Sequence, residues 1–457
     1  MKIFLENFLK RNQFSVLVLF IILLGCNQPE DTSQQSPPNV ILIMADDMGF
    51  ECLGTYGSAE YKTPVLDKMA QEGVKFNQAY SQPLCTPSRV KIMTGKHNFR
   101  NYSHFGYLNP QEKTFGNLFQ EAGYKTMIAG KWQLNGIYHD LPGNQDNTRP
   151  FEFGFDEYCL WQVTKQKKNG ERFADPLIEQ NGELISNLEG QYGPDIFTDY
   201  ILNFIDQNQD SAFFIYYPMV LVHDPFVVTP DSEEWGSIEN RYQQDTSYFA
   251  DMMEYTDKLV GKIFDKLRET GLEENTFVIF TADNGTHVTI NSSMEDGREI
   301  QGAKGSTIEY GFRVPMIAKW PGKIQTGSEV DHLIDFNDIL PTITEVADIN
   351  LTDFSTDGRS FLPLLMGQDY TPKEHLYIFY EPKWGKWKGR SEYAFNQDYK
   401  LYADGSFYHI AVDKLEKNPI SFESATEEQR QVWNQLKEVI EEKQSDQEVK
   451  ISARLTN

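Results

Sequence analysis

The sequence has few cysteines and a deficit of positive charge. Only 4 of the 457 residues are cysteine, which excludes a small disulfide-stapled fold, and none lies in a spacing typical of a zinc site. Lysine and arginine number 42 against 67 aspartate and glutamate residues, a formal net charge of −25. Nucleic-acid binding depends on basic contacts to phosphate, so this balance argues against a nucleic-acid partner. An anionic substrate would need a local basic pocket.

The chain has no long hydrophobic run after its first 26 residues. Phe14–Leu24 is too short to span a bilayer as a helix, and its basic N-terminal flank is typical of a signal peptide. Leu23-Leu24-Gly25-Cys26 resembles a bacterial lipobox, in which the cysteine carries lipid, and an ordinary cleaved signal sequence is the alternative. We expect a lipoprotein signal peptide over residues 1–26 and a flexible tether over 27–38.

These features predict an exported bacterial lipoprotein. The lipid on Cys26 would anchor it to the outer membrane, on either the periplasmic or the cell-surface face. Two further cysteines, Cys52 and Cys159, could pair in an oxidising compartment, and the sequence does not decide whether they do.

Short apolar runs alternate with amphipathic stretches along most of the chain. Residues 111–122 and 246–269 have helical periodicity, and the strand-length runs are residues 40–44, 124–129, 213–217, 277–280 and 314–319. This alternation predicts an α/β fold with a large mixed, mostly parallel sheet sandwiched by helices. We assign this main domain to residues 39–368.

The pattern changes near residue 370. Four short runs have the character of antiparallel strands: residues 376–380, 393–396, 400–402 and 407–410. An amphipathic helix follows, and Ser424-x-x-Glu427 is a candidate capping box at its start. Residues 369–457 are therefore predicted to form a smaller C-terminal α+β subdomain.

Polar residues follow two of the apolar runs. Asp46 and Asp47 come directly after the first run, and Asp283 and Asn284 follow the run at 277–280. Ligands of open α/β sheets bind at the carboxyl ends of the strands. Three carboxylates and one amide oxygen suit a hard divalent cation, calcium more readily than magnesium. For either pair alone, a turn or helix-capping role is the alternative.

The segment Cys85-Thr86-Pro87-Ser88-Arg89 predicts the start of a helix, since Pro87 suits a first helical turn. The free N–H groups at such a start attract an anion, and Arg89 could add a planar fork. A lone cysteine is more often a small buried hydrophobe.

This segment resembles the maturation signature of the type I, formylglycine-dependent sulfatases of the alkaline phosphatase-like superfamily. The resemblance implies that a formylglycine-generating maturation enzyme oxidises Cys85 to formylglycine, whose hydrated aldehyde is the nucleophile. It also implies one calcium ion per chain. The ligand set that it implies is Asp46, Asp47, Cys85, Asp283 and Asn284.

Three more segments resemble the family. Gly130-Lys131-Trp132 and the stretch around Lys304 match segments whose lysines contact sulfate, and His223 lies where the family places a histidine near the leaving group. The resemblance thus implies catalytic roles for Cys85, Arg89, Lys131, His223 and Lys304. Imidazole titrates near neutral pH, so His223 could protonate the departing alcohol.

One position departs from the family pattern. A histidine usually follows the tryptophan of the Gly-Lys-Trp segment and acts as a base, whereas this chain has Gln133. Glutamine forms hydrogen bonds but does not take up a proton at neutral pH. His287, three residues after Asn284, is the most plausible substitute, and a role as an ordinary loop histidine is the alternative.

The resemblance implies a sulfatase that hydrolyses a sulfate ester, and a sulfated small molecule or oligosaccharide is the expected substrate. Two alternatives remain at this stage. The first is a phosphonate monoester or phosphodiester hydrolase of the same superfamily, and the second is a surface lipoprotein that binds glycan without cleaving it.

Overall fold

The computed structural model describes residues 36–165, 171–386 and 389–455. The signal peptide, the lipobox with Cys26 and almost all of the tether lie outside the described residues, so those assignments stay predictions. In the described part of the chain, no helix has both the length and the apolar character needed to cross a membrane. The chain from Pro38 onward forms one compact unit.

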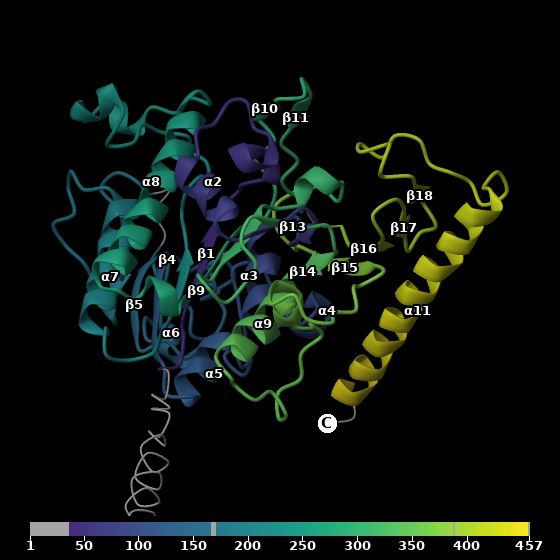
Figure 1. Cartoon of the computed structure of the whole chain (residues 1–457), viewed down its shortest axis with the longest axis horizontal. Coiled ribbons are helices and arrows are strands. Elements are labelled where there is room, and N and C mark those ends of the chain that lie inside the picture. Colours follow the sequence, from purple (N-terminus) through teal and green to yellow (C-terminus); the bar gives the residue numbers. More distant parts are fainter. Residues whose placement is uncertain (1–35, 166–170, 387–388, 456–457) are drawn as a thin grey trace, which may run out of the picture. The chain divides into compact units, whose positions relative to one another are not determined.

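A ten-stranded mixed sheet forms the centre of this unit (Figure 1), in the order β13-β2-β12-β9-β1-β8-β4-β5-β6-β7. Its central strands run parallel and are β9 (Thr276–Ala282), β1 (Asn39–Ala45), β8 (Phe213–Pro218), β4 (Lys125–Lys131) and β5 (Glu157–Trp161). The outer strands are β12 (Met316–Lys319), β2 (Val74–Phe76), β13 (Ser328–Val330), β6 (Ile178–Gln180) and β7 (Glu183–Leu184). The predicted mixed, mostly parallel sheet is confirmed. The last apolar run begins at Met316 rather than 314, and its strand runs antiparallel to β9.

Helices cover both faces of the sheet (Figure 1). One group comprises α2 (Pro64–Gln71), α7 (Gly193–Gln207) and α8 (Tyr248–Glu269), and the other comprises α3 (Cys85–Thr94), α5 (Phe115–Glu121) and α9 (Ile339–Val346). The expected helix at 111–122 begins only at Phe115, because Thr114 caps it by accepting a hydrogen bond from the Gly116 N–H.

Several short elements complete the fold. The short helices are α4 (Asn98–Asn101), α6 (Arg149–Glu152) and α10 (Leu362–Leu365). Two small sheets pair β10 (Asn291–Ser293) with β11 (Glu299–Gln301) and β3 (Ala79–Tyr80) with β14 (Ile334–Asp335). Cys52 and Cys159 are buried and free, so they do not form the disulfide that the sequence left open.

The C-terminal part contains the expected antiparallel sheet and helix. The elements are β15 (Leu376–Tyr380), β16 (Ser391–Phe395), β17 (Lys400–Tyr402), β18 (Phe407–Tyr408) and α11 (Glu427–Leu455). The predicted Ser424–Glu427 capping box is wrong. Instead, Thr426 N–H donates to Gln429 Oε1 (2.9 Å) and Gln429 N–H donates to Thr426 Oγ1 (3.2 Å), whereas Ser424 bonds Ser421. The helix starts two residues later than the box predicted because this pair satisfies its free N–H groups.

This sheet packs against the segment that leads into α3. Side chains of β15 and β16 form one apolar cluster with Tyr80, Leu84 and Phe312. Leu84 is the residue directly before α3. The C-terminal sheet therefore supports the segment that carries Cys85.

Candidate active site

Strand register brings the pair Asp46-Asp47 and the pair Asp283-Asn284 together. In the parallel pairing of β1 with β9, Ala45 lies opposite Ala282, so Asp46 and Asp283 leave the sheet side by side. Hydrogen bonds continue past the strand ends. The Asp283 N–H donates to the backbone oxygen of Ala45 (3.0 Å), and the Asp47 N–H donates to the side-chain Oδ1 of Asp283 (3.1 Å). Asp46, Asp47, Asp283 and Asn284 are all fully buried.

Each of the three carboxylates contacts a cation from a distant part of the chain. Lys131, at the end of β4, donates to Asp46 Oδ2 at 2.7 Å. Arg89 Nη2, one turn into α3, donates to Asp283 Oδ2 at 2.9 Å, and Lys304 donates to Asp47. Three residue pairs that are distant in sequence thus form one buried ionic cluster.

The pKa values of two of these carboxyl groups move in opposite directions. Burial raises the pKa of Asp46, but Lys131, His223 and Arg89 outweigh it and hold that pKa well below its usual range. Burial, together with the charge on Asp46, raises the pKa of Asp283 despite the neighbouring Arg89. A divalent cation between these two carboxylates would offset their mutual repulsion and favour the charged form of Asp283.

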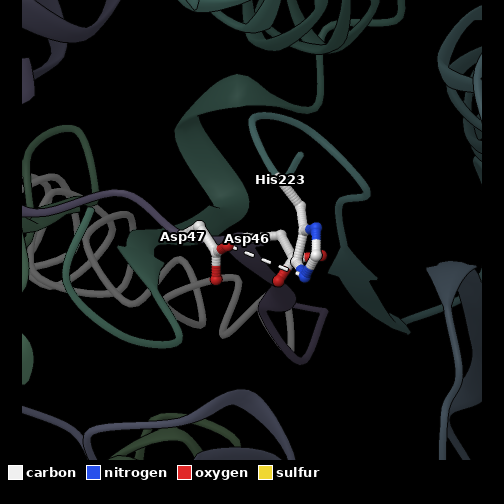
Figure 2. A group of neighbouring side chains, drawn as sticks. All are labelled: Asp46, Asp47 and His223. Carbon is white, nitrogen blue, oxygen red and sulfur yellow. Dashed lines mark ion pairs between the residues drawn. The ribbon is translucent and has the colours of Figure 1, made fainter. Parts of the chain in front are cut away.

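The donor set fits such a cation. Asn284 donates its amide N–H to Asp47 Oδ1 (2.9 Å), and its Oδ1 atom is buried with no hydrogen-bond partner among the residues that the structure describes. An orphaned amide oxygen beside buried carboxylates is suited to coordinate a hard cation such as calcium. Figure 2 shows the other geometric possibility, in which Asp46, Asp47 and His223 offer ligand atoms within 4.8 Å of one another. Nε2 of His223 already accepts from Lys304, which favours the oxygen set.

The helix start predicted within residues 85–89 is confirmed, since Cys85 is the first residue of α3 and no side chain caps this end of the helix. The side chain of Cys85 is buried. Burial raises the pKa of the thiol, although Lys131 and Lys304 lower it, so Cys85 is a neutral thiol at neutral pH rather than a thiolate. Its sulfur therefore lies in the electrostatic field of the same two lysines that the sequence assigns to sulfate binding.

His223 lies beside Asp47 and Lys304. Its Nε2 atom is 2.9 Å from Lys304 Nζ and 3.6 Å from Asp47 Oδ2, and its Nδ1 atom is 3.0 Å from Asp224 Oδ1. Burial lowers the pKa of His223, and Asp47 opposes this.

His287 and Gln133 occupy separate places. Among the contacts of the described residues, His287 Nδ1 meets Thr289 Oγ1 at 2.9 Å, and its Nε2 is 3.9 Å from Asp224 Oδ1. Gln133 is buried, has a positive φ of 56°, and accepts from Thr86 Oγ1 at 3.5 Å. His287 thus borders His223 through Asp224, and no contact links it to Gln133 in the described part of the chain. Its role as a substitute base stays a prediction.

Sequence reasoning missed two residues of this region, Arg172 and Tyr138. Arg172 Nη1 lies 3.8 Å from Asp46 Oδ2. Tyr138 accepts from Gln162 Nε2 (2.5 Å) and from Gln133 Nε2 (3.5 Å) through its hydroxyl oxygen. Tyr138 lies in the loop after β4, and Arg172 lies in the loop after β5. Neither belongs to a recognisable motif, so no signal in the sequence indicated them.

The fold and the site define an α/β enzyme of the alkaline phosphatase-like superfamily, with its centre at the carboxyl ends of parallel strands. Residues 38–349 match the family described as Sulfatase, and residues 304–446 match the one described as N-sulphoglucosamine sulphohydrolase, C-terminal. The chain belongs to the sulfatase family. It is therefore a sulfuric ester hydrolase, a class that typically uses a metal ion and formylglycine.

Curated relatives agree with this assignment. Arylsulfatase A from Homo sapiens is 31% identical over 75% of this chain and 70% of its own length. N-acetylgalactosamine-6-sulfatase from Canis lupus familiaris is 30% identical over 75% of this chain and 68% of its own length.

Solved structures share the fold. One, described as BT4656 in complex with its substrate D-glucosamine-2-N,6-O-disulfate, has a TM-score of 0.73 at 21% identity and covers 90% of this chain and 98% of that one. The phosphonate monoester hydrolase of Agrobacterium radiobacter has a TM-score of 0.65 at 16% identity, with 90% of this chain and 96% of that one covered. The fold alone therefore does not separate sulfate from phosphonate substrates.

Proposed function

We propose that this protein hydrolyses a sulfate ester of a carbohydrate, with Cys85 as formylglycine and with one calcium ion held by Asp46, Asp47, Asp283 and Asn284. The observation that carries the proposal is the buried ionic cluster of three carboxylates with Lys131, Lys304 and Arg89, together with a buried Cys85 at the N-terminus of α3 whose pKa the two lysines lower. Calcium would supply fixed positive charge at the sulfate oxygens. Formylglycine would supply a hydroxyl nucleophile that a neutral thiol does not provide.

The side chains of this site have separable tasks. Lys131 and Lys304 hold and neutralise the sulfate group, and the N–H groups at the start of α3 face the same anion. Arg89 fixes the carboxylate of Asp283, and its Nη1 atom also donates to the Lys131 carbonyl at 3.0 Å, so it ties α3 to β4. His223 passes a proton to the departing alcohol oxygen.

A carbohydrate is the favoured alcohol because aromatic side chains border the site. Trp384 packs on Phe105 (ring centroids 4.6 Å apart) and on Tyr138 (4.7 Å), and Tyr138 contacts Gln133. Ligand pockets combine such apolar surfaces with a few placed polar groups, a combination that suits a sugar ring. A carbohydrate substrate also agrees with the sugar disulfate named as the substrate of one structural relative.

The test is release of inorganic sulfate from a panel of sulfated mono- and oligosaccharides, measured beside matched phosphodiesters and phosphonate monoesters. We expect kcat/KM for at least one sulfated sugar to exceed that for the matched phosphorus esters. Faster turnover of a phosphonate monoester would support the alternative hydrolase. Binding of the sugars without release of sulfate would support the non-catalytic glycan-binding alternative.

A further inference from the structure

Arg172 is a buried cation without a hydrogen-bond partner in the described part of the chain. Only 9% of the residue is exposed. Its Nε and Nη1 atoms are both closed to solvent and form no hydrogen bond with the described residues. A buried N–H group left unpaired costs stability, and native structures rarely keep two on one guanidinium without a ligand.

Trp161 holds this guanidinium in a defined position. The Arg172 Cζ atom lies 4.2 Å from the centre of the Trp161 ring, an arrangement that fixes the plane of the fork by cation–π attraction. Trp161 ends β5 and lies opposite Lys131 in the pairing of β4 with β5. Arg172 therefore enters the site beside Lys131, with Nη1 at 3.8 Å from Asp46 Oδ2.

Arg172 and His223 border the same pair of carboxylates. Arg172 Nη1 lies 3.8 Å from Asp46 Oδ2, and His223 Nε2 lies 3.6 Å from Asp47 Oδ2. His223 is the residue that we place at the departing alcohol. A guanidinium beside the same carboxylate pair is therefore placed to meet a substituent of the alcohol part of a bound ester.

Arg172 is the fourth cation of the site, and no carboxylate of the described residues lies at hydrogen-bonding distance from it. Arg89, Lys131 and Lys304 each contact one of the three buried carboxylates at that distance. With Asp224, which contacts His223, four carboxylates face these four cations. A calcium ion would add two positive charges, and a sulfate monoester brings one negative charge. A second anion would balance the site and pair the free N–H groups.

We propose that Arg172 binds a second anionic substituent of the substrate, a carboxylate or a sulfate, carried by the alcohol part near the scissile sulfate ester. The inference rests on the proposed function. The substrate class is then a sulfated uronic acid or a multiply sulfated sugar rather than a singly sulfated neutral sugar.

The experiment compares three matched sugars that carry the same scissile sulfate: a neutral hexose, the corresponding uronate, and a hexose with a second sulfate. Each is assayed with the natural chain, with Arg172→Gln, and with Arg268→Gln as a control that removes a surface guanidinium at the end of α8. We expect the natural chain to prefer one or both dianionic sugars. The preference, expressed as a ratio of kcat/KM values, should fall at least tenfold in Arg172→Gln, chiefly through KM.

The comparison of sugars identifies the substituent. If Arg172→Gln lowers the preference for the uronate, the substituent is a carboxylate. If it lowers the preference for the disulfated sugar, the substituent is a sulfate. Arg172→Lys, which keeps the charge without the fork, should recover part of the preference. An equal fall for all three sugars would mean that Arg172 holds the scissile sulfate, and this result, an unchanged ratio, or no preference in the natural chain would overturn the proposal.

A binding measurement separates this proposal from the proposed function. Absence of sulfate release from all three sugars would defeat the function alone. Calorimetric titration of the sulfated uronate, the disulfated hexose and the neutral hexose sulfate then decides the role of Arg172. Tighter binding of a dianionic sugar that is lost in Arg172→Gln supports it, and equal binding by both proteins overturns it. Thermal unfolding of each variant verifies that it is folded.

Discussion

The ammonium group of Lys304 lies 2.9 Å from Nε2 of His223. An ammonium group only donates, so Nε2 accepts and the ring is neutral, with its proton on Nδ1. Nδ1 faces Asp224, whose carbonyl oxygen is 2.6 Å away and whose carboxylate is 3.0 Å away. The burial that lowers the pKa of His223 agrees with this neutral form. Lys304, whose pKa Asp47 raises against the effect of burial, keeps its proton, so His223 must take up a proton from solvent before it can protonate the alcohol.

This arrangement predicts that His223 matters most for poor leaving groups. His223→Gln should lower kcat/KM for a sugar sulfate by about 10²-fold or more, because a general acid contributes on that order. For 4-nitrophenyl sulfate the loss should be much smaller, since nitrophenolate leaves without a proton. Initial rates with both substrates provide the measurement, and equal losses would assign His223 to sulfate binding instead.

The role of Cys85 predicts a specific chemical change. Mass spectrometry of the peptide containing residue 85 from active protein should show the aldehyde or its hydrate in place of the thiol. Cys85→Ala should lower sulfate release by roughly 10³-fold or more, since removing a nucleophile removes its whole pathway.

Cys159→Ala is the matched control for Cys85→Ala. Cys159 is likewise buried and free, but it lies within β5. We expect that variant to lose about 1 kcal/mol of stability and to keep its activity. Full activity in protein whose residue 85 is entirely thiol would contradict the assignment.

The oxygen ligands predict stabilisation by calcium. Saturation at about 100 times the Kd should raise the free energy of unfolding by about 2.7 kcal/mol. Chelation should abolish sulfate release but leave the chain folded, because Lys131, Arg89 and Lys304 already pair with the carboxylates. Thermal unfolding with chelator, calcium or magnesium measures the effect.

Asp283→Asn should lose the calcium-dependent rise in Tm. The control is Asp257→Asn, because Asp257 is also buried but accepts hydrogen bonds from the Val65 and Leu66 N–H groups at the start of α2. That variant should have a lower Tm and keep the calcium-dependent rise. A rise retained in Asp283→Asn would remove this residue from the ligand set.

Glu51 predicts a pH dependence of stability. Burial raises its pKa from 4.5 to about 7, although Thr286 Oγ1 donates to Oε1 at 2.6 Å. Between these two values the folded chain binds more protons than the unfolded chain, so the free energy of unfolding falls as the pH rises. The contribution lost by neutral pH is up to about 3 kcal/mol.

Glu51→Gln should remove this part of the pH dependence, because glutamine does not ionise. Urea unfolding at about pH 5 and about pH 8 measures it. The exposed Glu234 provides a control. Glu234→Gln should show the same change in the free energy of unfolding between the two pH values as the natural chain. If the free energy of unfolding of Glu51→Gln changes with pH as much as that of the natural chain, the Glu51 carboxyl group does not titrate in that range.

Local patterns predicted much of the fold because buried strands and helices place apolar residues at regular positions in the sequence. The runs at 40–44 and 277–280 are apolar throughout, as expected for strands covered on both faces, and became β1 and β9. Helix starts were less predictable. Ser424 and Thr426 both offer a hydroxyl near the start of α11, and only the backbone path selects Thr426.

The sequence by itself determined the residue types of the site and their places after strands or at a helix start, because these follow from short-range periodicity and from motif spacing. Only the tertiary structure decided which cation meets which carboxylate, that His287 lies away from Gln133, and that Arg172 joins the cluster. Those contacts join residues far apart in the chain. Strand register and the paths of the loops determine these contacts, and neither can be read from a short stretch of sequence.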